Sequence, residues 1–133
     1  MFVYQVKAKI HHIDAAGVMF FGYYFYLAHD AYEAFLEEIS FAVENILQQD
    51  FLIPLTHAEA NYRAPVRLGD TLTIELQIDE IGDTSFTVRY DISNQFSRPV
   101  ANLRTVHTTI SKRIPKPIDI PPDLRKALQR FTS

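Results

Sequence analysis

Residues 11–25 read HHIDAAGVMFFGYYF, and this stretch carries the strongest structural signal in the chain. A carboxylate, Asp14, stands where a strand-like segment ends and a turn of two alanines and one glycine begins. Gly17 can take a positive φ or let another molecule approach the backbone closely. An apolar, aromatic-rich segment with helical spacing follows. We therefore expect an acid beside a helix N-terminus, where unpaired N–H groups can stabilise a reacting carbonyl.

The composition indicates one domain without covalent or metal supports. A chain of 133 residues can bury a core of its own. It contains no cysteine, which excludes a disulfide framework, a thiolate nucleophile and a zinc–thiolate site. No basic leader precedes an apolar run at Met1, and no apolar stretch approaches the roughly 18 residues that span a bilayer. We therefore expect a soluble, cytoplasmic protein that does not bind a membrane.

The net charge of −3 is unevenly distributed along the chain. Residues 98–130 hold eight basic side chains against two acidic ones, and the remainder holds five against fourteen. A solvated basic surface explains this, and so does a surface that meets an anion such as a CoA nucleotide. We do not expect a nucleic-acid partner, because the whole chain is acidic and shows no basic–aromatic stripe.

Two periodicities divide the chain into predicted elements. Alternating apolar and polar residues predict half-buried strands, and apolar residues three and four apart predict helices. The predicted strands span residues 2–11, 53–64, 70–78, 84–92 and 100–112, with a hairpin turn at 79–83. The predicted helices span residues 23–39 and 41–48, with a short final helix from Pro121 to Phe131. The order is one strand, a long central helix and four strands in a meander.

These elements predict an α+β architecture in which a long helix lies against a curved antiparallel sheet of about five strands. The helix of residues 23–39 is more apolar all round than one sheet face can bury. A wrapped sheet or a subunit interface would cover the remainder. Alanines at 28, 31 and 34 would let this helix lie close to the sheet.

Two motifs carry a resemblance to a known family. The pattern D-x-A-G-V-x-[FY] runs from Asp14 to Phe20 and is followed by Tyr24; the second motif is THAEANYRAPVRLGD at residues 56–70. Both resemble the hotdog-fold acyl-CoA thioesterases of the 4-hydroxybenzoyl-CoA thioesterase family, over about residues 3–115. More narrowly, AHDAYEAFLEEI and IPLTHAEANYRAPV resemble the branch that hydrolyses 1,4-dihydroxy-2-naphthoyl-CoA in phylloquinone and menaquinone synthesis.

The resemblance implies a single hotdog domain over residues 1–133, with a short C-terminal extension from about 115 to 133. It implies an acyl-CoA substrate, most specifically 1,4-dihydroxy-2-naphthoyl-CoA, and no cofactor or metal. It also implies a homotetramer built from dimers, with active sites between subunits.

Asp14 is the predicted catalytic residue. An unperturbed aspartate has a pKa near ~3.9 and is ionised at neutral pH. It can attack a thioester carbonyl or activate a water that attacks, and the sequence leaves both open. The alternative is an aspartate that caps a helix or shapes a turn. Counting along the family motif assigns the oxyanion-binding backbone N–H to Phe21, and Gly17 matches the turn glycine of the family.

His29, Glu33 and His57 are predicted substrate-binding residues. His29 and Glu33 are four residues apart on one face of the central helix. They either form a hydrogen-bonded pair, or His29 faces the acyl pocket and contacts a polar ring substituent. His57 comes from the following strand, whose neighbourhood in the family borders the acyl site. A hydroxylated aromatic acyl group would give these side chains a partner, whereas a fatty chain would not.

His11 and His12 precede Asp14 and raise the question of a metal site. On an extended strand, successive side chains point to opposite faces, so both cannot ligate one ion without a bulge. We predict no metal site and expect surface histidines, with His12 near enough to the turn to line the site.

The CoA phosphates need a basic partner. In the 4-hydroxybenzoyl branch, basic residues bind the nucleotide after residue 80, but this chain has Gly-Asp-Thr at 82–84. We therefore predict that Arg89, Arg104, Lys112 and Arg113 contact the phosphates.

Three other functions remain open from the sequence. One is a thioesterase of broader specificity for short-chain or aryl acyl-CoA. Another is a non-catalytic hotdog module that binds acyl groups, although such a module has no need of Asp14. The third is a dehydratase of the same fold, for which His29 would be the catalytic residue on the central helix.

Overall fold

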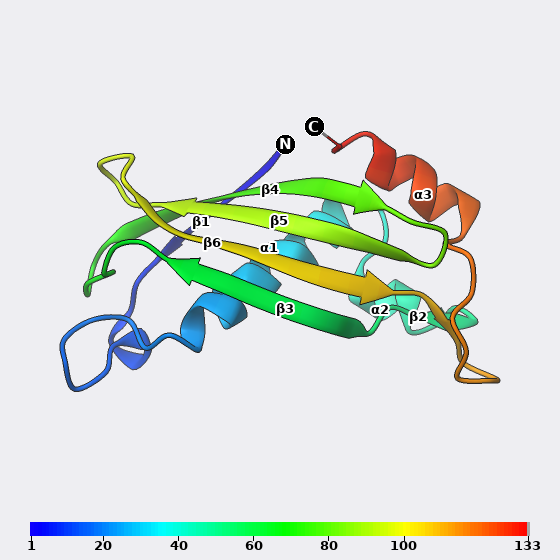
Figure 1. The fold of residues 1–133 in the computed structure, drawn as a ribbon, viewed down its shortest axis with the longest axis horizontal. Coiled ribbons are helices and arrows are strands. Elements are labelled where there is room, and N and C mark those ends of the chain that lie inside the picture. Colours follow the sequence, from blue (N-terminus) through cyan, green and yellow to red (C-terminus); the bar gives the residue numbers. More distant parts are fainter. Residues whose placement is uncertain (133) are drawn as a thin grey trace.

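The computed structural model describes residues 1–132, which form the α+β architecture that the sequence predicts. Its elements follow the predicted order (Figure 1). They are β1 (Phe2–Lys7), the 3-10 helix η1 (Ile10–His12), α1 (Tyr23–Glu38), α2 (Val43–Ile46), β2 (Phe51–Leu52), β3 (Leu55–Tyr62), β4 (Thr71–Ile81), β5 (Ser85–Ser93), β6 (Pro99–Thr108), β7 (Ile110–Ser111) and α3 (Pro122–Gln129). No helix among residues 1–132 has the length and apolar content to cross a bilayer.

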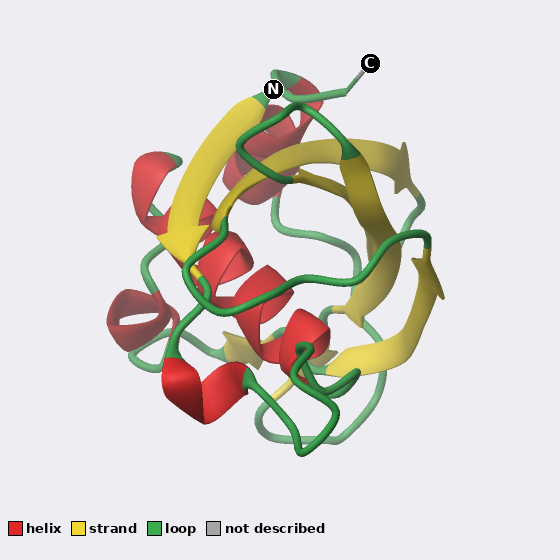
Figure 2. Ribbon diagram, turned by 90° about the vertical axis from the view of Figure 1, so that its left-hand side faces the viewer, coloured by secondary structure: helices red, strands yellow, loops and turns green. Residues whose placement is uncertain are grey.

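A five-stranded antiparallel sheet with the order β1-β4-β5-β6-β3 curls around α1 (Figure 2). The meander β4-β5-β6 forms its centre, because short turns join antiparallel neighbours. β1 and β3 are the two edge strands; β1 precedes α1 in the sequence and β3 follows it. The long helix occupies the concave side of the sheet, where it contacts β1, β4 and β6.

The core lies between α1 and the concave, inner face of the sheet. Alternate residues of β4 and β5 are fully buried there, and their neighbours point outward, as the period-two pattern predicts. Ala28 and Ala31 of α1 are 1% and 0% exposed, which lets the helix approach the sheet closely. Each buried Leu, Ile or Phe side chain contributes about 1.5–3 kcal/mol of transfer free energy to this core. Packing of the apolar helix onto the sheet thus stabilises both elements.

The edge strand β3 is exposed along nearly its whole length. Leu55 and Tyr62 leave 47% and 46% of their surface open, and Tyr26 of the neighbouring helix leaves 69%. The other edge of β3 pairs with no strand among residues 1–132. An exposed strand edge that carries apolar side chains is a template for pairing with another chain.

The N-terminal strand is shorter than the predicted span of residues 2–11. The sheet pairing ends at Lys7, and the next residue, Ala8, bonds to the turn before β4: its N–H donates to Asp70 O at 2.8 Å and its carbonyl accepts from Gly69 N at 2.9 Å. Residues 10–12 then turn as η1, which leaves Ile10 72% exposed. The predicted strand over residues 2–11 is therefore too long, and Ile10 lies outside it.

The other boundaries shift by a few residues, and one predicted strand is divided. Thr109 separates β6 from β7; its hydroxyl oxygen lies 2.6 Å from Ile118 O and 3.0 Å from Thr84 O, and the two carbonyls share its one O–H proton. These bonds tie the chain beyond β7 to the turn before β5. The predicted C-terminal helix is present as α3, which begins at Pro122, one residue after the predicted start, and its Leu124 and Leu128 are fully buried. Residues after 115 therefore contribute to the same core as the sheet.

Candidate active site

The Asp14 turn is a tight loop closed by backbone hydrogen bonds. Asp14 N donates to Val18 O at 2.9 Å, and Gly17 N donates to Asp14 O at 3.0 Å. Gly17 adopts φ +82°, as its place in the turn predicts. A Cβ at this position would meet no atom within 4 Å, so the positive φ rather than space favours glycine.

The Asp14 carboxylate is exposed and held on one side only. Its Oδ1 accepts a hydrogen bond from Ala16 N at 2.8 Å, the usual side-chain bond of an aspartate turn. Within residues 1–132 no other hydrogen bond or ion pair engages this carboxylate. One oxygen therefore fixes the orientation of the group and leaves the other oxygen open to a reacting molecule.

The segment between this loop and α1 presents an unpaired backbone donor. Phe20 N donates to His12 O at 3.0 Å and Tyr23 N donates to Phe20 O at 3.0 Å. Between them, Phe21 N donates to no backbone carbonyl in the described part of the chain, and the Phe21 side chain is 61% exposed. Phe21 precedes Gly22, the N-cap residue of α1, so this free N–H lies in the loop immediately before the helix.

Tyr62 anchors this segment to the edge strand. Its hydroxyl donates to Phe21 O at 3.1 Å, and its ring packs edge-on against Tyr24 at 4.9 Å. Burial raises the pKa of Tyr62, so the phenol remains a neutral donor at neutral pH. From the sequence, Tyr62 was only part of the motif at residues 56–70; in the structure it links β3 to the Phe21 carbonyl.

His12 is not a surface residue. It is only 6% exposed, and its Nδ1 accepts a hydrogen bond from Lys9 N at 2.9 Å. Burial and the neighbouring His11 lower its pKa. The 3-10 turn places the rings of His11 and His12 4.0 Å apart. The expectation of two surface histidines on opposite faces of a strand is wrong for His12, because the strand ends at Lys7.

A groove of about 370 Å³ lies between α1 and the inner face of β3, β5 and β6. Its lining residues are Phe25, Tyr26, His29, Asp30, Leu55, Ala58, Tyr90 and Thr105. A second hollow of about 320 Å³ follows along α1 and is lined mainly by aliphatic residues of α1, α2 and β2. His29 borders both hollows. Phe25, in the first turn of α1, is the groove residue nearest in sequence to Phe21.

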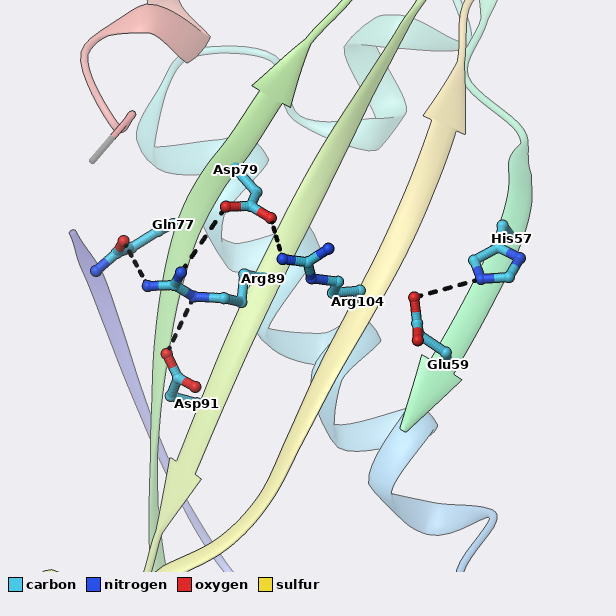
Figure 3. Close-up of polar contacts among 7 residues, drawn as sticks. All are labelled: His57, Glu59, Gln77, Asp79, Arg89, Asp91 and Arg104. Atoms are coloured by element: carbon cyan, nitrogen blue, oxygen red, sulfur yellow. Dashed lines mark hydrogen bonds and ion pairs between the residues drawn. The ribbon is translucent and has the colours of Figure 1, made fainter. Parts of the chain in front are cut away.

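The three predicted substrate-binding residues do not converge. His29 is exposed at the groove, and Glu33 is exposed on the same helix, but no hydrogen bond joins them within residues 1–132. The predicted alternative of a hydrogen-bonded pair is therefore wrong. His57 lies on the outer face of β3, and its Nε2 is 3.5 Å from Glu59 Oε1 (Figure 3). Ala58 fills the groove side of that strand instead.

The four basic residues predicted to contact phosphate also lie in two places. Arg89 and Arg104 occupy the outer face of the sheet, on either side of Asp79 (Figure 3). Arg104 Nη2 lies 2.6 Å from Asp79 Oδ2, and Arg89 Nη2 donates to Gln77 Oε1 at 3.0 Å. Lys112 and Arg113 are exposed just after β7, and the Lys112 ammonium donates to the Leu47 carbonyl. The structure therefore does not gather these four side chains into one anion site.

One group of buried polar residues was missed by the sequence reasoning. Tyr90 OH and Thr105 Oγ1 are 2.8 Å apart, and Thr105 Oγ1 is 2.9 Å from His107 Nε2. The sequence predicted only that Tyr90 and the TVHTT run at residues 105–109 lie in strands, at 84–92 and 100–112. Polar residues at alternate positions of a central strand were the available signal.

The chain is similar to thioesterases in sequence and in fold. Residues 8–128 match the model of the "Thioesterase-like superfamily". A 1,4-dihydroxy-2-naphthoyl-CoA hydrolase of Synechococcus elongatus is 32% identical over 118 residues, which cover 87% of this chain and 86% of the relative.

The chain belongs to the thioesterase-like superfamily. A solved 1,4-dihydroxy-2-naphthoyl-CoA thioesterase from Synechocystis superposes with a TM-score of 0.91 at 29% identity, over 96% of this chain and 95% of that one. A gentisyl-coenzyme A thioesterase superposes with a TM-score of 0.84 at 25% identity, over 92% and 98%. The predictions of a hotdog fold and of membership in this thioesterase family are confirmed.

Proposed function

We propose that this member of the thioesterase-like superfamily hydrolyses an aromatic acyl-CoA, specifically 1,4-dihydroxy-2-naphthoyl-CoA, in phylloquinone or menaquinone synthesis. The Asp14 turn carries the proposal. It combines an exposed, oriented carboxylate with the free N–H of Phe21 in one loop between η1 and α1. The names of the relatives at 29–32% identity favour the naphthoyl ester over other aromatic esters.

In the proposed reaction, the carboxylate of Asp14 acts on the thioester carbonyl. It either attacks the carbonyl carbon or takes a proton from a water that attacks. The Phe21 N–H donates to the oxyanion that forms, which stabilises the transition state more than the ground state. The C–S bond then breaks and the CoA thiolate leaves. On the nucleophilic route, water hydrolyses the mixed anhydride in a second step.

The groove between α1 and β3 is the proposed acyl site. Its volume of about 370 Å³ lies in the range of small-molecule sites, and its lining is mainly aromatic and apolar. His29 stands at its rim and is the proposed contact for a polar ring substituent. Glu33 and His57 remain predicted substrate contacts from the sequence, although both lie outside the lining of the groove.

Lys112 and Arg113 are the preferred candidates for the CoA phosphates, because both are exposed and carry no carboxylate partner among the described residues. Arg89 and Arg104 would first have to leave Asp79, so we propose them only as secondary contacts. Charge reversal at Lys112 should raise KM and leave kcat nearly unchanged, since a phosphate contact is made equally in ground and transition states. An unchanged KM would assign the nucleotide to another surface.

The proposal includes a cytoplasmic homotetramer built from dimers. The exposed edge of β3 supports it, because Leu55, Tyr62 and Tyr26 leave apolar surface open beside unpaired strand groups. The groove borders this same edge, so a partner subunit would complete the acyl site. Light scattering should give about four times 15.3 kDa, and a compact, active monomer would contradict the shared site.

A panel of acyl-CoA esters with a thiol-detecting reagent tests the function directly. We expect the highest kcat/KM with 1,4-dihydroxy-2-naphthoyl-CoA, lower values with benzoyl-CoA, and the lowest with palmitoyl-CoA. Similar values across short-chain and aryl esters would favour the broad-specificity thioesterase. No thiol release from any ester would favour the non-catalytic acyl-binding module, and hydration of an enoyl-CoA would favour a dehydratase.

A further inference from the structure

A cluster of four uncharged polar side chains lies buried beneath the groove. We call Tyr32, Tyr90, Thr105 and His107 the buried hydroxyl cluster; they come from α1, β5 and β6 and are 1–5% exposed. Tyr90 and Thr105 line the first hollow and Tyr32 lines the second. The cluster therefore spans the region between the two hollows, next to His29. Nothing in the proposed hydrolysis mechanism uses these four residues.

Three members of the cluster form a chain of hydrogen bonds that can run in either direction. The bonds from Tyr90 OH to Thr105 Oγ1 and from Thr105 Oγ1 to His107 Nε2 measure 2.8 Å and 2.9 Å. A hydroxyl can donate or accept, and a neutral imidazole Nε2 can do either according to its tautomer. If His107 donates, the Tyr90 proton is free; if His107 accepts, a Tyr90 lone pair is free. Tyr90 can thus offer a donor or an acceptor to the groove.

The four side chains of the buried hydroxyl cluster are all uncharged at neutral pH. Burial, together with the nearby His29, lowers the pKa of His107 to about 3. Burial raises the pKa of Tyr90 and of Tyr32 far above neutrality. A cluster of neutral donors and acceptors suits a hydroxyl or carbonyl group, whereas a carboxylate would face a desolvation cost with no opposite charge.

Tyr32 adds a hydrogen-bonding group that the protein leaves unused. Its ring stacks on His107 with centroids 4.2 Å apart, and the His29 ring lies 5.8 Å away. The hydroxyl oxygen is buried and finds no hydrogen-bond partner in the described part of the chain. An unsatisfied buried hydroxyl destabilises the folded protein, because it has lost its hydrogen bonds to water without replacement. Such a cost is expected where a bound ligand supplies the missing partner.

We propose that the buried hydroxyl cluster is a specificity site that recognises a neutral hydroxyl or carbonyl group on the ring of the bound acyl group. The inference rests on the proposed function, because it assumes that the acyl ring occupies the groove. Apolar groove residues such as Phe25 and Ala58 contact the ring. Tyr90 supplies a hydrogen bond within the groove, and Tyr32 supplies one from the adjoining second hollow. The site selects hydroxylated aromatic esters, because an unsubstituted ring leaves these buried groups unpaired.

Paired esters and conservative substitutions test the proposal. The esters are 1,4-dihydroxy-2-naphthoyl-CoA and 2-naphthoyl-CoA, which share the ring system and differ in the hydroxyl groups. Tyr90→Phe and Thr105→Val should lower kcat/KM for the dihydroxy ester about 10–100-fold and change it less than about threefold for the plain ester. Thr105→Ser keeps the hydroxyl and should retain the preference of the native protein. Thr87→Val, on the outer face of β5, is the matched control and should change neither ester.

Tyr32→Phe gives a readout that a purely structural role would not produce. It removes an unsatisfied buried hydroxyl, so the midpoint of urea unfolding of the free protein should stay the same or rise. The preference for the dihydroxy ester should fall at the same time. A lower midpoint with an unchanged preference would overturn the role of Tyr32 as a ligand contact.

The outcomes separate the two proposals. Equal losses for both esters in Tyr90→Phe and Thr105→Val, or no loss for either, would overturn the specificity site while the thioesterase function stands. A native protein that releases thiol from neither ester would overturn the proposed function and the specificity site together.

Discussion

The two faces of the sheet use polar residues in opposite ways. On the outer face, Arg89 and Arg104 flank Asp79, and their side chains are 33% and 50% exposed. On the inner face, Tyr90 and Thr105 are neutral and almost fully buried. Charge is tolerated where water screens it, and a buried site keeps only neutral, hydrogen-bonded groups. Under the proposed function, the neutral inner face would hold the acyl ring by shape and hydrogen bonds, whereas the charged outer face offers groups only for the polar parts of the ligand.

The largest predicted difference between the two faces is a loss of stability at acid pH caused by the buried His107. Its pKa of about 3 lies below the value near ~6.5 of an unfolded chain, so the unfolded state binds more protons between these values. Above pH ~6.5, His107 is neutral in both states and does not affect the free energy of unfolding. Below that pH the unfolded state gains a proton and the free energy of unfolding falls, until the folded state is protonated too, near pH 3. Between pH 7 and pH 4 the loss should be on the order of 3 kcal/mol. Urea unfolding across this range measures it.

Two histidine variants make this measurement specific. His107→Gln should flatten the acid side of the stability profile, although it also loses packing against Tyr32 and Phe86. His57→Gln, on the exposed outer face, should leave the shape of the profile unchanged. If the two variants give the same profile, burial of His107 does not control the acid stability. His12, whose pKa is also lowered, contributes in the same direction in both variants.

The outer ion pairs should matter less. Asp79→Asn removes the partner of both Arg89 and Arg104, and the predicted loss is about 0.5–1 kcal/mol at low salt. Part of that network is weak already, because Arg89 Nε lies 3.3 Å from Asp91 Oδ2 without hydrogen-bond geometry. The loss should shrink at 1 M salt, where charges are screened. A loss above about 2 kcal/mol that salt does not change would contradict this view of the outer face.

Local periodicity predicted most of the fold. The central helix and the meander follow directly from apolar spacing, since one face of each element is buried along its length. Periodicity failed where a distant segment decides the backbone path. Ala8 leaves the strand geometry because its partners are Gly69 and Asp70, which lie about sixty residues away in the chain. The same event turns His12 inward, and no local pattern reveals it.

The candidate site was predictable only in part. The turn at Asp14 and Gly17 follows from residue type, because a positive φ favours glycine and a short polar side chain shapes a turn. The sequence could not show that His57 lies on the outer side of the sheet while His29 lies at the groove on the inner side, since the orientation of His57 depends on the register of β3 against β6. The hydrogen bond between Thr105 and His107 could not be predicted either. Alternating apolar and polar residues predict which side of a strand a residue lies on, but not which groups it contacts.

The central claim is that Asp14 performs the chemistry. Asp14→Asn keeps the size of the side chain and the hydrogen bond from Ala16 N, but removes the charge that attacks or activates water. We expect kcat for 1,4-dihydroxy-2-naphthoyl-CoA to fall by roughly 10²–10⁴. The melting temperature should stay within a few degrees, since the turn remains bonded.

Asp119→Asn, a change of the same kind at an exposed residue far from the turn in sequence, is the control and should keep full activity. The most direct test is therefore kcat and melting temperature measured together on native protein, Asp14→Asn and Asp119→Asn. A large loss of kcat in a folded Asp14→Asn protein alone is the predicted result. Near-normal turnover by folded Asp14→Asn protein would contradict the catalytic role of Asp14 and leave it as a turn residue.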